Sequence, residues 1–316
     1  TYDRILPIVD KSNIILVTNA DYAPLVREQL PDISEEQLLL EPARRNTAPC
    51  IAWAARHIAA IDPEASMIVA ASAHLILGEK KFEEQVTRGF EFVESHDALL
   101  TLGINPTRPE TGYGYIQVGQ EAAPCINRVK TFTEKPDLDL AKVFLQTGEF
   151  VWNSGIFLWK VHAILKALAE CAPDLSGVFE AGADTFGTPR EREFINNHFA
   201  GCQSISIDYA VMESAKNVYV ERVDFTWNDL GNWSALYDNS PKNSDGNVAH
   251  NCNLRAYDST GNIVAVKGEK LIVMEGIKDY IIADTGDVLL LCPKAQEQRI
   301  KQMVNDIKQL FDGRYL

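Results

Sequence analysis

The stretch Asn13–Thr18 has the sequence NIILVT, an apolar and β-branched run that predicts a buried β-strand. The polar cluster Asn19–Asp21 follows directly and is a plausible helix start, and an amphipathic stretch then continues to Leu30. Further along the chain we expect strands at 38–40, 67–70 and 98–102 and helices at 47–60 and 82–93. Strands that alternate with helices at this spacing indicate βαβ units and a mostly parallel sheet.

The rhythm changes after Pro109, where paired antiparallel strands replace the alternation. We expect strands at 113–118, 128–133, 156–159 and 217–223, and helices at 138–145, at 161–169 and from 233 onward. Short strands separated by glycines follow from 247 to 292, and an amphipathic closing helix is expected at 295–311. The predicted domains are a main α/β domain of residues 1–243 and a small β-rich domain with a C-terminal helix, residues 244–316.

Composition narrows the class of protein. The 316 residues carry a net charge of −14, which disfavours nucleic acid as a partner because a phosphate backbone needs a broad basic face. No apolar run approaches the roughly 20 residues that span a bilayer, and no secretion leader is evident. The cysteines lie far apart without a CxxC pair, which is typical of a reducing compartment. We therefore expect a cytoplasmic protein without a membrane partner.

Residues Glu41–Pro49, with the sequence EPARRNTAP, lie between a predicted strand and a predicted helix. Such a turn directs the amides of a helix start toward a ligand, and Arg45, Asn46 and Thr47 add donors for a base or a phosphate. The same pattern also fits a capped helix start with surface arginines. His74 closes a second short loop after a strand, where α/β sheets place ligand contacts, although a lone histidine is weak evidence.

Three later motifs could bind a sugar phosphate. Tyr113 and Gly114 offer a flat wall and a close backbone approach, or form a plain hairpin turn. Glu134 can accept hydrogen bonds from vicinal hydroxyls and Lys135 can neutralise a phosphate, although a solvated strand end is the alternative. Asn153 precedes a buried strand and suits another hydroxyl contact, or caps a turn.

Asp229 lies between aromatic residues in the stretch FTWNDLGNW, residues 225–233. A carboxylate at that place is a candidate ligand for Mg²⁺, which prefers one or two carboxylates together with substrate phosphates and water. A helix N-terminal cap is the alternative interpretation.

The ordered series EPxxRNTAP, SxH, TGYGYI, EKP, WNSGIF, SIDYAVME and WxDLGxW resembles the bacterial mannose-1-phosphate guanylyltransferase family over nearly all of residues 1–293. The resemblance implies a Rossmann-like nucleotidyltransferase domain with a small C-terminal β domain. It also implies GTP and mannose 1-phosphate as substrates, GDP-mannose as product and Mg²⁺ as cofactor. Through the matching motifs, Glu41 and Ser72 join the expected nucleotide contacts, and Asp229 becomes the expected catalytic metal ligand.

The sequence departs from the family pattern in two places. The family's second metal-binding aspartate corresponds to position 73, where this sequence has Ala73. The family's glycine-rich GGxGxR loop and PKQF lysine would lie before Thr1 and are not in this sequence. A sheet without the strand that carries this loop should expose two apolar edges. We expect these departures to impair catalysis, since each lost transition-state contact commonly costs about 10²–10³ in rate.

Two alternative functions stay open from the sequence. One is a pyrophosphorylase that uses another nucleotide or another sugar 1-phosphate, and the other is a non-catalytic homologue that binds a sugar nucleotide. The small β-rich module and the closing helix are candidate contact surfaces for a homodimer.

Overall fold

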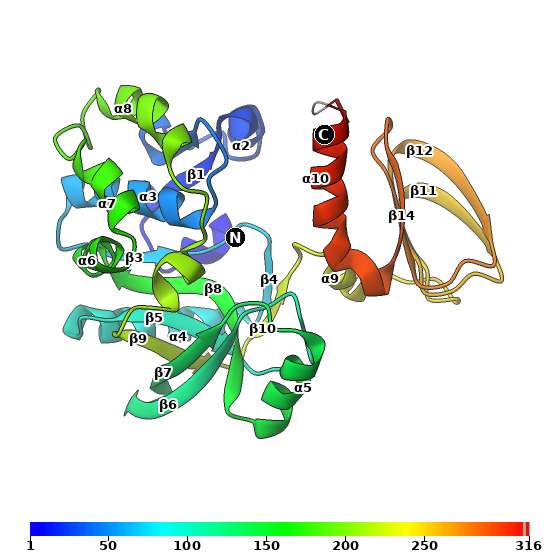
Figure 1. The fold of residues 1–316 in the computed structure, drawn as a ribbon, viewed down its shortest axis with the longest axis horizontal. Coiled ribbons are helices and arrows are strands. Elements are labelled where there is room, and N and C mark those ends of the chain that lie inside the picture. Colours follow the sequence, from blue (N-terminus) through cyan, green and yellow to red (C-terminus); the bar gives the residue numbers. More distant parts are fainter. Residues whose placement is uncertain (312–313, 316) are drawn as a thin grey trace. The chain divides into compact units, whose positions relative to one another are not determined.

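The computed structural model describes residues 1–311 and 314–315 (Figure 1). The chain divides into two compact units, the first formed by Thr1–Ser72 with Ile76–Trp227 and the second by Ala73–Leu75 with Asn228–Leu316. The domain boundary expected at 243/244 stays a prediction. The last residues of that predicted second domain, 312–313 and 316, lie outside the described residues.

A six-stranded mixed sheet forms the centre of the first unit, in the order β3-β8-β5-β9-β7-β6. Its strands are β3 (Ser66–Val69), β5 (Leu99–Ile104), β6 (Tyr115–Ala123), β7 (Ile126–Thr133), β8 (Phe150–Lys160) and β9 (Val218–Val223). The predicted mixed α/β architecture is confirmed. The sheet contains less parallel pairing than the alternation predicted, because β8 inserts antiparallel between β3 and β5 and leaves β5–β9 as a parallel pair.

Strands β1 (Leu16–Asn19) and β2 (Leu38–Glu41) form a separate parallel pair. Among the described residues, β1 pairs only with β2, and β3 ends the six-stranded sheet. All of β1 is partly exposed, whereas every residue of β5 is buried. In the described part of the chain, the β1–β2 pair is therefore separate from the six-stranded sheet.

Helices cover both faces of the six-stranded sheet. One face packs against α3 (Thr47–Ile61), α6 (Val161–Cys171) and α7 (Pro173–Glu180), which lie together in Figure 1. The other face packs against α4 (Glu79–Ser95). Neighbouring strand residues alternate between the two cores, as a pleated strand requires. The remaining helices of this unit are α1 (Tyr2–Ile5), α2 (Ala23–Gln29), α5 (Leu138–Thr147) and α8 (Glu191–His198).

The second unit is built around the four-stranded sheet β11-β12-β13-β14. Its strands are β11 (Val248–Tyr257), β12 (Ile263–Glu275), β13 (Tyr280–Asp284) and β14 (Leu289–Pro293). Three successive strands pair in parallel, which stacks Val248, Ile263 and Ile281 in one buried cluster. Helix α9 (Trp233–Asn239) and the closing helix α10 (Ile300–Leu310) contribute to the same cluster, and the predicted β-rich module with a terminal helix is confirmed.

Two crossings connect the units, at residues 72–76 and 227–228. The short strands β4 (His74–Leu77) and β10 (Thr226–Asp229) pair with each other at these crossings. Across the described part of the chain, we find no helix with the length and apolar character needed to cross a bilayer.

A contact between the partly exposed Arg88 and the buried Glu221 fastens α4 to the sheet. Glu221 on β9 is fully buried, and its Oε1 accepts a hydrogen bond from Arg88 Nε at 2.9 Å. Burial raises the pKa of the Glu221 carboxyl to about 7, against the opposing attraction of Arg88. The folded state therefore holds a proton on Glu221 in a pH range where the unfolded chain has released it.

Replacing Glu221 by the neutral isostere Gln should flatten the dependence of stability on pH. The wild type loses the contribution of this site as pH rises through the folded pKa of about 7, because the buried carboxyl must then ionise. The E221Q variant should therefore gain stability relative to the wild type between pH 5 and 8, by about 2 kcal/mol. Urea unfolding at both pH values measures this, with exposed Glu84→Gln as control. A stability difference between E221Q and the wild type that is the same at pH 5 and pH 8 would contradict the raised pKa of Glu221.

Candidate functional site

The predicted nucleotide motif follows the end of β2. Glu41 is the last residue of this strand, and α3 begins at Thr47. Asn46 caps the helix: its side chain accepts a hydrogen bond from the Thr47 amide at 2.9 Å, with a left-handed backbone at φ 67°. The turn therefore places the start of α3 directly after β2, with the Thr47 amide already bonded to Asn46.

Two of the predicted nucleotide contacts, Arg45 and Thr47, hold this turn against a distant segment. Arg45 Nε donates to the Ala200 carbonyl at 2.7 Å. Thr47 Oγ1 accepts a hydrogen bond from the Ile207 amide at 2.9 Å, and the Ala48 amide donates to the Ile205 carbonyl at 3.1 Å. These side chains thus support the shape of the turn through contacts within the protein.

Glu41 differs from these neighbours. Its Oε1 atom is buried and has no hydrogen-bond partner among the described residues. Burial raises the pKa of the Glu41 carboxyl, while a hydrogen bond from the Cys50 thiol opposes the shift. Burial, together with the charge of Glu41, raises the pKa of Cys50 to about 12, so the thiol stays protonated. A buried carboxylate oxygen without a partner is costly and suits a ligand that supplies donors.

The predicted metal position lies where β4 meets β10. Asp229 ends β10, and its Oδ1 accepts the Gly231 amide at 2.9 Å. The Leu230 amide donates to the Ala73 carbonyl at 3.2 Å, so the two positions expected to share a metal are neighbours. Beside them, Ser72 uses its carbonyl to accept Thr1 Oγ1 at 2.9 Å. Within residues 1–311 and 314–315, no three His, Cys, Asp or Glu side chains cluster as a metal site.

The predicted sugar-phosphate motifs converge around Gly114. A β-carbon at this glycine would lie 2.4 Å from Glu134 Oε2 and 3.4 Å from the Asn153 β-carbon. The backbone N–H of Asn153 also donates to the Gly114 carbonyl at 2.8 Å. Lys135 Nζ lies 3.3 Å from Glu134 Oε1, and its side chain is half-exposed. A side chain at position 114 would therefore displace the Glu134 carboxylate from its present place.

Tyr113 has a different environment from the other predicted sugar contacts. It is only 5% exposed, and its ring packs edge-to-face against Trp152 and Trp227 at centroid distances of 5.2 and 5.1 Å. The Tyr113 ring thus belongs to the apolar core, next in sequence to Gly114.

Asp208 joins this group, although the sequence analysis did not select it. Asn153 Nδ2 donates to Asp208 Oδ1 at 2.8 Å. Burial raises the pKa of both Asp208 and Glu134, and the negative charge of Asp208 raises that of Glu134 further. The stretch SIDYAVME contained Asp208 in the family resemblance, but nothing in its local pattern indicated that this carboxylate would face Asn153.

The shape of β8 brings Asn153 into the group. The register between β5 and β8 shifts between Thr101 and Gly103, opposite the β8 residues 153–157. Gly155, with φ 69°, lies in the bulge. Bulges of this kind redirect side chains next to active sites. The bulge brings the Asn153 side chain to Thr101, whose Oγ1 donates to Asn153 Oδ1 at 2.9 Å.

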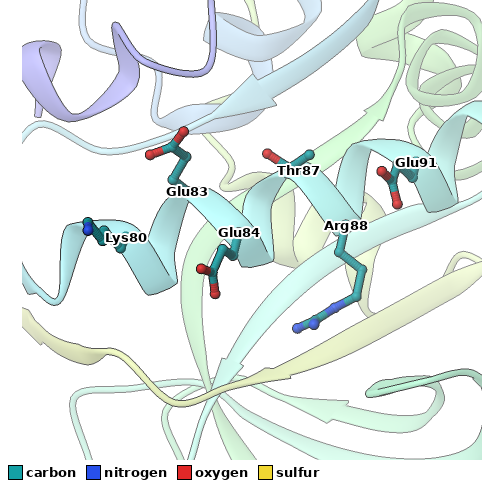
Figure 2. A pocket seen from close by; sticks show the side chains of 6 residues that line it. All are labelled: Lys80, Glu83, Glu84, Thr87, Arg88 and Glu91. Atoms are coloured by element: carbon teal, nitrogen blue, oxygen red, sulfur yellow. The ribbon is translucent and has the colours of Figure 1, made fainter.

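A separate surface depression lies on the outer side of α4. Figure 2 shows its six lining side chains projecting from this helix: Lys80, Glu83, Glu84, Thr87, Arg88 and Glu91. None of the sequence-predicted site residues lines it, and its Arg88 is already engaged by Glu221. The converging motifs, rather than this depression, form the candidate functional site.

Comparisons with known proteins identify both parts of the chain. Residues 6–246 match the family described as Nucleotidyl transferase, and residues 255–307 match the MannoseP isomerase/GMP-like beta-helix domain. A mannose-1-phosphate guanylyltransferase of Escherichia coli K12 is 34% identical over 97% of this chain and 65% of its own length. The enzyme of the same name from Salmonella muenchen is 34% identical over 98% and 65%.

A solved structure gives the same result for the fold. Mannose-1-phosphate geranyltransferase from Thermus thermophilus superposes with a TM-score of 0.80 at 27% identity, covering 97% of this chain and 87% of that one. The chain spans just under two thirds of the length of the two bacterial guanylyltransferases, 65% in each case. Its fold, its motifs and the match over residues 6–246 together lead to one conclusion: the chain belongs to the nucleotidyl transferase family.

Proposed function

We propose that the chain is a nucleotidyltransferase that makes GDP-mannose and pyrophosphate from GTP and mannose 1-phosphate. The observation that carries this proposal is the convergence of Glu134, Asn153 and Lys135 around Gly114. Carboxylate, amide and ammonium groups together suit a phosphorylated sugar, because they accept from hydroxyls, donate to hydroxyls and neutralise phosphate. The names of the two bacterial relatives support the choice of guanine nucleotide and mannose.

In the proposed reaction, an oxygen of the mannose 1-phosphate group attacks the α-phosphorus of GTP. A new oxygen–phosphorus bond forms, the bond from the α-phosphorus to the oxygen bridging to the β-phosphorus breaks, and pyrophosphate leaves with that oxygen. Such a transfer needs little covalent help, so the protein contributes position and charge neutralisation. Glu134 and Asn153 orient the sugar, with Gly114 providing room, and Lys135 offsets the phosphate charge.

The preference for guanine is assigned to Glu41. Guanine presents two adjacent donors on one edge, the ring N1–H and the exocyclic N2 amino group, and a carboxylate can accept both. The buried Glu41 Oε1, which has no partner among the described residues, provides an acceptor of this kind. Asn46, Ser72 and His74 remain proposed nucleotide contacts, while Arg45 and Thr47 contribute by holding the turn.

The residues present fit a divalent cation held by a single protein carboxylate. Asp229 supplies that carboxylate, and the methyl group of Ala73 cannot act as a ligand. Mg²⁺ accepts such an arrangement when phosphates and water complete its shell. When bound, the cation neutralises negative charge on the phosphates. Ala73 is also the observation that favours a second candidate function, a sugar-nucleotide binder with little or no turnover.

Restoring a carboxylate at position 73 distinguishes the two functions. The Ala73 carbonyl already pairs with the Leu230 amide, so Ala73→Asp should leave the backbone unchanged and add a second metal ligand. We expect Mg²⁺-dependent tightening of GTP binding by about tenfold and an increase of about 10²-fold in pyrophosphate release. Titration calorimetry and a pyrophosphate assay measure these, with Ala71→Asp as the neighbouring control. Unchanged GTP binding and absent turnover in A73D would favour the binder.

Exchange of Glu41 tests the base assignment. Inosine triphosphate lacks the N2 amino group, so the wild type should bind GTP about tenfold more tightly than inosine triphosphate. Glu41→Gln should reduce this preference to about twofold, because the amide offers a single acceptor and a competing donor. Exposed Glu36→Gln is the control. If E41Q still binds GTP about tenfold more tightly than inosine triphosphate, a group other than Glu41 recognises the N2 amino group of guanine.

The carboxylate of Glu134 gives a prediction with a pH dependence. Its pKa lies above the ordinary 4.5, and the ionised form is the better acceptor of sugar hydroxyls. The affinity for GDP-mannose should therefore rise with pH through this raised pKa, while the affinity for GDP changes less. Glu134→Gln should weaken GDP-mannose binding about tenfold at pH 8. It should also remove the pH dependence of the GDP-mannose affinity. The exposed Glu121→Gln variant should behave as the wild type, and equal losses for GDP and GDP-mannose would refute the role.

A further inference from the structure

We infer that Asp208 is a positioning residue of the sugar-phosphate subsite, where it fixes the side-chain amide of Asn153 for contact with a sugar hydroxyl. This inference rests on the proposed function and adds a residue for which that proposal gives no role. The carboxylate acts through Asn153, which is itself the proposed contact to the ligand.

The hydrogen bonds around Asn153 specify one orientation of its amide. Its Oδ1 accepts from Thr101 Oγ1 at 2.9 Å and from the Gly155 amide at 3.2 Å. Its Nδ2 donates to Asp208 Oδ1 at 2.8 Å. A flipped amide would lose the bonds to the Gly155 N–H and to the Asp208 carboxylate, so these two partners fix the orientation. Because an amide nitrogen carries two hydrogens, one N–H remains to donate to a ligand.

The segment that leads into Asp208 is itself held by the first residues of α3. It is the first residue of a short π-helix, Asp208–Met212, a rare element that often occurs at functional sites. The preceding residue, Ile207, donates its amide to Thr47 Oγ1 at 2.9 Å, and Ile205 accepts from the Ala48 amide at 3.1 Å. The backbone of residues 205–208 thus connects the start of α3 to the Asn153 side chain, with hydrogen bonds at both ends.

The charge of Asp208 is costly unless a ligand uses the arrangement it maintains. Asp208 and Glu134 are two carboxylates in the same subsite, and the repulsion between them raises the pKa of Glu134. An apolar or neutral packing partner would satisfy the fold without this cost. A donor fixed in advance of binding, such as the free N–H of the Asn153 side chain, by contrast loses little free energy to reorganisation when a ligand arrives.

Calorimetric titration of GDP-mannose and of GDP tests the role, because their affinity ratio isolates the sugar. We expect Asp208→Ala, which removes the acceptor of Asn153 Nδ2, to weaken GDP-mannose binding about tenfold and to change GDP binding less than twofold. Asp224→Ala, which removes an exposed carboxylate bonded to Lys81, should change neither. The thermal midpoint of each variant, measured in parallel, reports any general loss of structure.

A second pair of variants tests the other side of the amide. Thr101→Val removes the donor to Asn153 Oδ1 and should lower the same affinity ratio, whereas Thr101→Ser keeps the hydroxyl and should retain it. This pair decides the question if D208A does not fold.

Two results would overturn the inference: an unchanged affinity ratio in both D208A and T101V, or equal weakening of both ligands, which indicates a purely structural role. A wild type that binds GDP-mannose no better than GDP would instead overturn the proposed function.

Discussion

The antiparallel insertion of β8 between β3 and β5 is the constraint on which the first unit depends. Its 11 residues pair with β3, β5 and β6, so one strand contacts three of the other five strands of the sheet. The same strand carries Asn153 beside a bulge, next to Gly114. Because β8 is buried along most of its length, Asn153 is positioned by a strand of the core rather than by a loop.

Electrostatics divides the candidate site into two regions of different character. Around Gly114 the carboxylates of Glu134 and Asp208 are partly desolvated, with Lys135 as the nearby positive charge. Such groups favour a ligand that presents many donors, as a sugar does. At the end of β2, Glu41 Oε1, which has no hydrogen-bond partner among the described residues, favours a base with donors on one edge. A net charge of −14 does not oppose phosphate binding when local amides and cations supply the contacts.

Much of this organisation could be predicted from sequence, because periodicity and turn signals are local. The helix starting at Thr47 and the buried strand after Ala98 follow from such patterns, and the motif order indicates the family. The place of β8 in the sheet could not be predicted, because strand order depends on long-range pairing. For the same reason, sequence did not indicate that Asp208 faces Asn153 or that Arg45 and Thr47 point to the segment 200–207.

The central claim is that the motifs around Gly114 recognise the sugar of a guanine sugar nucleotide. A crystal structure of the chain with GDP-mannose tests it most directly. We predict that mannosyl hydroxyls lie within hydrogen-bond distance of the Glu134 carboxylate and of Asn153 Nδ2, while Asn153 keeps its bond to Asp208. A bound nucleotide whose mannosyl group contacts neither residue, or projects into solvent, would contradict the account.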